Sequence, residues 1–102
     1  MTVTLHPSEG ARFLLERASD DGARATYHAV IYTPDAEHST TATLAEDGTV
    51  ELAAPTGAPQ ELDDMLVMQA RLVARGAAKR REDGLAAWPA RLLRWRGPGR
   101  GA

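Results

Sequence analysis

Apolar and polar residues alternate over two stretches in the first half of the chain, and each stretch is interrupted by an acidic turn that ends in glycine. The first covers residues 11–33 around Asp20-Asp21-Gly22, and the second covers residues 38–53 around Glu46-Asp47-Gly48. Alternation with a period of two is typical of a half-buried strand, and Asp-Gly between two such runs favours a hairpin. The pattern therefore predicts two β-hairpins.

The length of the second loop follows from the pairing of apolar residues. A two-residue loop would place Leu44 opposite Glu51, whereas a three-residue loop places Leu44 opposite Val50 and Ala42 opposite Leu52. Because a slip of one residue turns every side chain to the other face of the sheet, the three-residue loop is predicted. Gly48, its last residue, should then have a positive φ.

The same test applied to the first hairpin predicts a three-residue loop of residues 20–22, with Gly22 at positive φ and Leu15 opposite Tyr27. One face of the sheet is then apolar and carries Phe13, Leu15, Ile31, Leu44 and Leu52. The other face is mostly polar, but it would carry a small exposed apolar patch beside His28, formed by Leu14, Val30 and Tyr32.

A turn at Pro34-Asp35 joins the two hairpins, because proline and aspartate both suit turn positions. The simplest arrangement is a four-stranded antiparallel meander over residues 10–53. Residues 1–9 form an N-terminal arm, in which Val3 to Leu5 would add a short edge strand.

A long amphipathic helix is predicted from Pro59 to about Arg81, since proline suits the first helical position and Gly84 ends the pattern. Its apolar stripe consists of Leu62, Met65, Leu66, Gln69, Leu72, Val73 and Gly76. This stripe should cover the apolar face of the sheet. Acidic residues occupy the first turns and basic residues the last, which complements the helix dipole.

The C-terminal segment of residues 85–96 is predicted to form a short basic helix or turn that begins at Pro89. Helical spacing would put Trp88, Leu92 and Trp95 on one side, with arginines on the other. Residues 97–102 should form a flexible tail. We therefore expect an α+β fold in one domain of 102 residues.

The charge on the chain is divided by position. Residues 1–70 carry 12 acidic and 3 basic side chains, a net charge of −9, whereas residues 71–102 carry 9 basic and 2 acidic, a net charge of +7. The total of −2 conceals this division. These opposite charges attract a charged partner, or they pair with each other within the chain or between two copies of it.

Composition also bears on the compartment and on chemistry. There is no cysteine, which excludes disulfides and cysteine-based zinc sites. The N-terminus lacks the pattern of a signal peptide, and no apolar run reaches the length of a membrane span. We expect a soluble, cytoplasmic protein.

No catalytic, metal-binding or cofactor-binding motif is recognisable, so we expect a protein that is not an enzyme and has no cofactor. His6, His28 and His38 lack the spacing of metal ligands. The paired carboxylates Asp20/Asp21 and Glu46/Asp47 are better explained by turn chemistry ahead of glycine.

The favoured function is a small protein-interaction or adaptor domain, forming a homodimer, whose basic C-terminal segment meets an acidic surface on its twin or on another protein. The residues expected to bind the partner are Trp88, Arg91, Leu92, Arg94, Trp95, Arg96, Tyr32 and Val30. A nucleic-acid-binding module is the alternative, and it would use Arg71, Arg75, Lys79, Arg80, Arg81, Arg91, Arg94 and Arg96. Docking of the Trp/Arg segment on a membrane surface is a third interpretation of the same residues.

Overall fold

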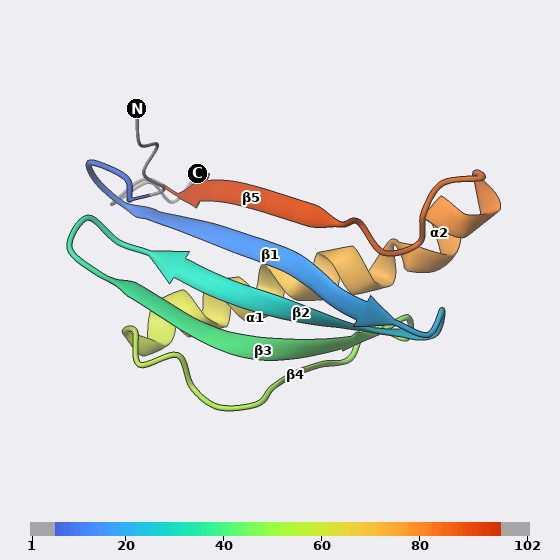
Figure 1. Ribbon diagram of the computed structural model, residues 1–102, viewed down its shortest axis with the longest axis horizontal. Coiled ribbons are helices and arrows are strands. Elements are labelled where there is room, and N and C mark those ends of the chain that lie inside the picture. The colour runs from blue at the N-terminus through green and yellow to red at the C-terminus, as the bar shows by residue number, and fades with distance from the viewer. Residues whose placement is uncertain (1–5, 97–102) are drawn as a thin grey trace.

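In a computed structural model, which describes residues 6–96, the chain forms an antiparallel sheet with helices on one face (Figure 1). The strands of the described part are β1 (Ala11–Asp20), β2 (Arg24–Tyr32), β3 (Glu37–Ala45), β4 (Val50–Leu52) and β5 (Arg91–Arg96). They lie in the order β4-β3-β2-β1-β5. The α+β class and the meander of β1 to β4 are therefore confirmed, and a fifth strand is added beside β1.

The predicted C-terminal helix is wrong, because residues 91–96 are strand β5, antiparallel to β1. A segment of six residues is too short to form a stable helix by itself. As a strand it pairs with the backbone N–H and C=O groups of β1, which would otherwise form an open edge. The helical spacing of Trp88, Leu92 and Trp95 is thus coincidental.

The second hairpin has the predicted register. Leu44 pairs with Val50 and Ala42 pairs with Leu52 around a three-residue loop. Gly48 has a φ of +96°. Asp47 accepts a 2.9 Å hydrogen bond from the backbone N–H of Thr49, and hydrogen bonds from Thr49 lower the pKa of the Asp47 carboxyl.

The first hairpin has a different register from the predicted one. Its tip is the two-residue turn Gly22-Ala23, because the N–H of Asp21 donates to the carbonyl of Arg24. Leu15 pairs with Ala29 rather than Tyr27. The pairing shifts at Ala18, between Arg17 and Ser19, where β1 contains a β-bulge. A two-residue turn alone would pair apolar residues of one strand with polar residues of the other, and the bulge puts the apolar residues of both strands back on the same face. The predicted apolar face is therefore retained although the loop length is wrong.

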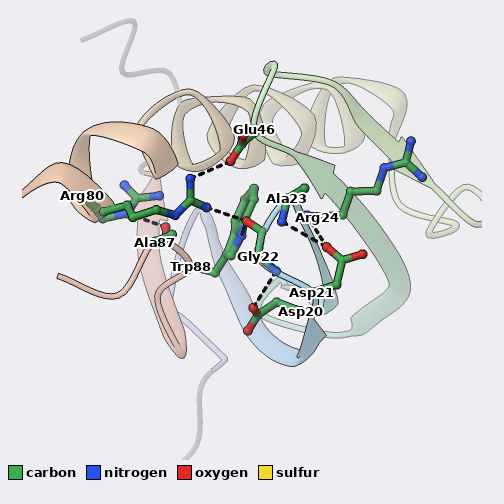
Figure 2. Close-up of polar contacts among 10 residues, drawn as sticks. Asp20, Asp21, Gly22, Ala23, Arg24, Glu46, Arg80, Ala87 and Trp88 are labelled. Atoms are coloured by element: carbon green, nitrogen blue, oxygen red, sulfur yellow. Dashed lines mark hydrogen bonds and ion pairs between the residues drawn. The ribbon is translucent and has the colours of Figure 1, made fainter. Parts of the chain in front are cut away.

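Aspartates at this tip act as turn residues (Figure 2). Asp20 accepts a hydrogen bond from the N–H of Gly22, and Asp21 accepts hydrogen bonds from the N–H groups of Ala23 and Arg24. The interpretation of this carboxylate pair as turn chemistry is confirmed.

Substitution of Gly48 by Ala is expected to lower the free energy of unfolding by about 1 kcal/mol or more, because a side chain is strained at positive φ. A Cβ there would also lie 3.2 Å from Cγ of Arg75. Gly22 has a φ of +94° but nothing within 4 Å of its position for a Cβ. Urea denaturation should therefore find Gly22→Ala destabilising, but less so than Gly48→Ala. The reverse order would contradict the packing of Arg75 over the second hairpin.

The predicted long helix is bent into α1 (Gln60–Arg75) and α2 (Ala77–Glu82) at Gly76. A side chain at position 76 would meet Nη1 of Arg80 at 2.6 Å, so the bend brings this guanidinium close to the backbone. Asp63, in the first turn of α1, is buried, and its carboxylate accepts hydrogen bonds from the hydroxyl and the N–H of Thr56 in the preceding connector, at 2.5 and 3.2 Å. These contacts hold the connector against the first turns of the helix.

The core lies between the sheet and the bent helix. Tyr27, Phe13, Ile31, Leu44 and Leu66 are among its largest fully buried side chains, together with Trp88. The helix contributes mainly small residues beside Leu66 and Val73, namely Ala70, Ala74 and Ala77. One member of the predicted stripe is misplaced, because the side chain of Leu72 is 64 % exposed.

The opposite face of the sheet is not the exposed apolar patch that the sequence predicts. Leu14 and Val30 are each only 3 % exposed. Leu93 of β5 pairs beside Leu14, and the segment before β1 folds back so that the ring of His6 meets the ring of Tyr32 edge-on at 5.3 Å. The proposed edge strand at residues 3–5 and the tail at residues 97–102 lie outside the described residues.

Candidate functional site

The start of β5 is held by Trp88, whose side chain is 2 % exposed. Its indole Nε1 donates a 3.0 Å hydrogen bond to the carbonyl of Gly22 at the tip of the first hairpin (Figure 2). Arg81 Nη2 donates to the same carbonyl at 2.6 Å, and Arg80 Nε donates to the carbonyl of Ala87 at 2.8 Å. These bonds attach the segment before β5 to the hairpin tip and to α2.

Two further contacts set the path of the chain into β5. The hydroxyl of Tyr27 donates a 2.6 Å hydrogen bond to the carbonyl of Pro89. Burial raises the pKa of Tyr27, and the nearby charges of Arg17 and Arg80 act in the opposite direction. A phenol has an ordinary pKa of about 10, so at neutral pH it already carries the proton that it donates. Arg17 Nη1 donates to the carbonyl of Trp88 at 2.6 Å.

The outer edge of β5 presents backbone groups in a defined order. The N–H of Arg17 donates to the carbonyl of Ala90 at 2.9 Å, so this pair is one of the hydrogen-bonded pairs of the β1–β5 ladder. Such pairs alternate along antiparallel strands. Given the register of β1 and β5, the N–H and C=O groups of Arg91, Leu93 and Trp95 therefore point away from β1. In the described part of the chain, no element lies beyond this edge (Figure 1).

The strand divides the predicted partner-binding residues between two faces. Arg91 and Trp95 lie on the face that also carries Tyr32 and Val30, because they pair with Glu16 and Arg12 of β1. Leu92, Arg94 and Arg96 lie on the helix side, and Trp88 is in the core.

Accessibility differs among these residues. Trp95 is 50 % exposed, and its Nε1 donates to the carbonyl of Glu9 at 3.0 Å. Arg91 and Arg94 are exposed, whereas Val30 is buried. The structure thus brings Arg91, Trp95 and Tyr32 together on one surface and removes Trp88 from it.

A hollow of about 230 Å³ lies on the helix side of β5, between this strand and the bent helix. Phe13, Leu15 and Leu92 contribute apolar surface from the sheet, and Leu72 contributes it from α1. Arg94 is the lining cation supplied by β5. Since α1 packs mainly on β3 and β4, the inner side of β5 is only partly covered (Figure 1).

Sequence reasoning missed Leu93 and this hollow. In the segment Arg91 to Arg96, neither set of alternating residues is purely apolar, so the sequence lacks the alternation of apolar and polar residues that predicts a strand. The exposed position of Leu72 depends on where the helix lies across the sheet, which helical spacing does not specify.

Opposite charges from the two halves of the chain meet within the molecule. Arg81 lies 3.0 Å from the carboxylate of Glu46, and Arg91 lies 3.7 Å from the carboxylate of Glu16. Some of the positive charge of the C-terminal third is therefore paired with negative charge of the N-terminal part within the same molecule. All four side chains are about half exposed, so each pair contributes little to stability, on the order of 0–1 kcal/mol.

The basic residues named for nucleic-acid binding are dispersed. Arg80 donates to the carbonyls of Val73 and Ala87, and Lys79 of α2 pairs with Asp83, the residue after that helix. Arg71 and Arg75 are exposed on α1.

Within residues 6–96, no group of three or more histidine and acidic side chains is placed to hold a metal ion. No helix in that part of the chain is long and apolar enough to cross a membrane. Comparison of the chain with protein-family models, curated proteins and solved structures finds no match. Inference about function therefore depends on the geometry of β5 and its surroundings.

Proposed function

We propose that this protein is a small non-enzymatic protein-interaction domain that binds an extended segment of a partner at the β5 edge. The supporting observation is the outward direction of the backbone groups of Arg91, Leu93 and Trp95. Addition of a strand to an open sheet edge is a recurrent mode of peptide recognition, in which main-chain hydrogen bonds provide affinity.

The hollow beside β5 supplies a site for side-chain selectivity. A segment added along β5 directs alternate side chains to the helix side, where Phe13, Leu15 and Leu72 line the hollow. An apolar side chain of the partner would pack against this lining, mainly on Leu72, which is 64 % exposed.

Cations on the same strand favour an acidic partner. Arg94 is exposed and makes no ion pair among the described residues. Nε of Arg96 is buried and has no hydrogen-bond partner in the described part of the chain. Carboxylates of a bound segment would pair with these two guanidinium groups.

A synthetic peptide of alternating aspartate and leucine provides a defined probe, with the lysine–leucine peptide as its charge-reversed counterpart. Fluorescence anisotropy should show that the acidic peptide binds more tightly and that its affinity falls as salt is added. Equal binding of both peptides would contradict the proposed acidic selectivity.

Two substitutions test the location. Leu93→Pro removes an outward N–H that β1 does not use, so the strand should persist while peptide binding is lost. Arg94→Glu should weaken binding, whereas Arg71→Glu on the exposed side of α1 is the charge-matched control. Circular dichroism checks that each variant is folded. Wild-type binding by folded Leu93→Pro would rule out docking at β5.

Nucleic-acid binding remains the second candidate because Trp95 is half exposed beside Arg12. An exposed indole flanked by cations can stack on a base. Glu16 and Glu37 lie on the same face, however, and repel phosphate. Sub-micromolar, salt-sensitive binding to a single-stranded oligonucleotide, lost in Trp95→Ala, would favour this candidate over protein docking.

A further inference from the structure

The geometry points to β5 of a second copy of this chain as an occupant of the β5 edge. We propose that two copies pair β5 with β5 in antiparallel orientation, about a two-fold axis that passes between the Leu93 residues of the two copies. This inference rests on the proposed function in one respect, since it requires β5 to be a docking edge; the second copy brings a basic strand to that edge and would compete there with an acidic segment.

Of the two edge strands in the described part of the chain, β5 is the one long enough for this pairing. At the other border of the sheet, β4 has three residues, whereas β5 has six and contains no proline. Short edge strands resist further pairing, and a longer edge with outward backbone groups accepts another strand. Arg94 Nη1 donates a 3.2 Å hydrogen bond to the outward carbonyl of Leu93, so this exposed side chain must move aside for the pairing.

Hydrogen bonding restricts how two β5 strands can align. The outward groups belong to Arg91, Leu93 and Trp95, so these residues must face outward residues of the second copy. Two symmetric registers satisfy this condition and pair five residues of each six-residue strand, one centred on Leu93 and one centred on Arg94.

Charge selects between the two registers. A centre at Arg94 would place the two Arg94 side chains directly opposite each other, about 4.5 Å apart at Cα, and like charges in that position destabilise a sheet. A centre at Leu93 places Leu93 opposite Leu93 of the second copy, and Arg91 opposite its Trp95. No arginine then faces another arginine directly.

The Leu93 register also accounts for the exposed indole. Trp95 is 50 % exposed on the face of the sheet where Arg91 lies. The guanidinium of Arg91 from the second copy would lie on this ring, an arrangement that stabilises through cation–π attraction. Leu93, which is half-buried in one copy, would be covered by its symmetry mate.

The dimer should be weak and should tighten as salt is added. Pairing of one short strand buries less surface than stable interfaces do. The two Arg94 side chains become diagonal neighbours at about 7–8 Å, and salt screens their repulsion. Binding of an acidic peptide should show the opposite dependence on salt, which separates the two events in one titration.

Cysteine cross-linking tests the register directly, because the chain contains no cysteine. In the proposed register the Cα atoms at position 93 lie about 5.5 Å apart, within the range that a disulfide spans. Under mild oxidation Leu93→Cys should form a covalent dimer at least about tenfold faster than Leu85→Cys, an exposed loop position used as the control, because pairing raises the effective concentration of the thiols.

Each outcome has a distinct meaning. Faster cross-linking of Arg94→Cys than of Leu93→Cys would overturn the Leu93 register. Rates at both positions equal to that of Leu85→Cys would overturn self-pairing at β5. The cross-linking rates could rule out self-pairing while the folded Leu93→Pro variant no longer binds the acidic peptide. In that case docking at β5 stands, and the occupant of the edge is an acidic segment and not a second copy. If the peptide test also fails, both proposals fall.

Discussion

Replacing Trp88 with alanine is expected to lower the free energy of unfolding by about 3–5 kcal/mol, which is the usual cost of truncating a buried tryptophan. The side chain is 2 % exposed and packs in the core between the sheet and the bent helix. A domain of this size has a total stability of only about 5–15 kcal/mol. Trp88→Ala should therefore leave the protein marginally folded, as urea denaturation followed by far-ultraviolet circular dichroism would measure.

Trp95→Ala is the matched control, because it removes the same side chain from a half-exposed position. Its expected cost is about 1 kcal/mol or less, the contribution of the hydrogen bond to Glu9. Equal destabilisation by the two substitutions would contradict the assignment of Trp88 to the core.

Fluorescence distinguishes the two indoles, since the chain contains two tryptophans. In Trp95→Phe the remaining Trp88 should emit at shorter wavelength and resist quenching by acrylamide. In Trp88→Phe the remaining Trp95 should emit at longer wavelength and be quenched more readily.

Leu66→Ala is expected to cost about 2–5 kcal/mol, because it leaves a cavity where the helix meets the sheet. Leu66 has no exposed surface. Leu72 lies six residues further along the predicted stripe but is 64 % exposed, so Leu72→Ala should change stability by no more than about 0.5 kcal/mol.

This pair of substitutions tests how α1 is rotated about its axis. Chemical denaturation of the two variants under identical conditions gives the difference directly. A large loss in Leu72→Ala with a small loss in Leu66→Ala would mean that the helix packs through the face that the structure leaves exposed.

The division of charge along the chain has a structural explanation in part. Arg91 faces Glu16 across β5 and β1, and Arg81 faces Glu46 of the second hairpin loop. Addition of β5 next to β1 therefore places Arg91, from the last third of the chain, against Glu16, from the first half. Arg94 is exposed and forms no ion pair within residues 6–96.

Local sequence determined the two hairpins, the helix and the apolar face of the sheet. Their signals act over short range: alternation along each strand, Asp-Gly at the turns, and helical spacing after Pro59. The register of the second hairpin was predictable because Leu44 and Val50 must share one face. In the first hairpin, the bulge at Ala18 decided the register, and alternation alone does not reveal a bulge.

Tertiary structure alone decided the fate of the C-terminal segment. Residues 91–96 suit a short helix or a strand nearly equally, and the free edge of β1 selects the strand, because pairing satisfies backbone groups that a short helix would leave to water. That choice separates Trp88 from Trp95, placing the first in the core and the second at the surface. The candidate docking edge is therefore a product of long-range pairing between β5 and a strand some eighty residues earlier, which no local pattern encodes.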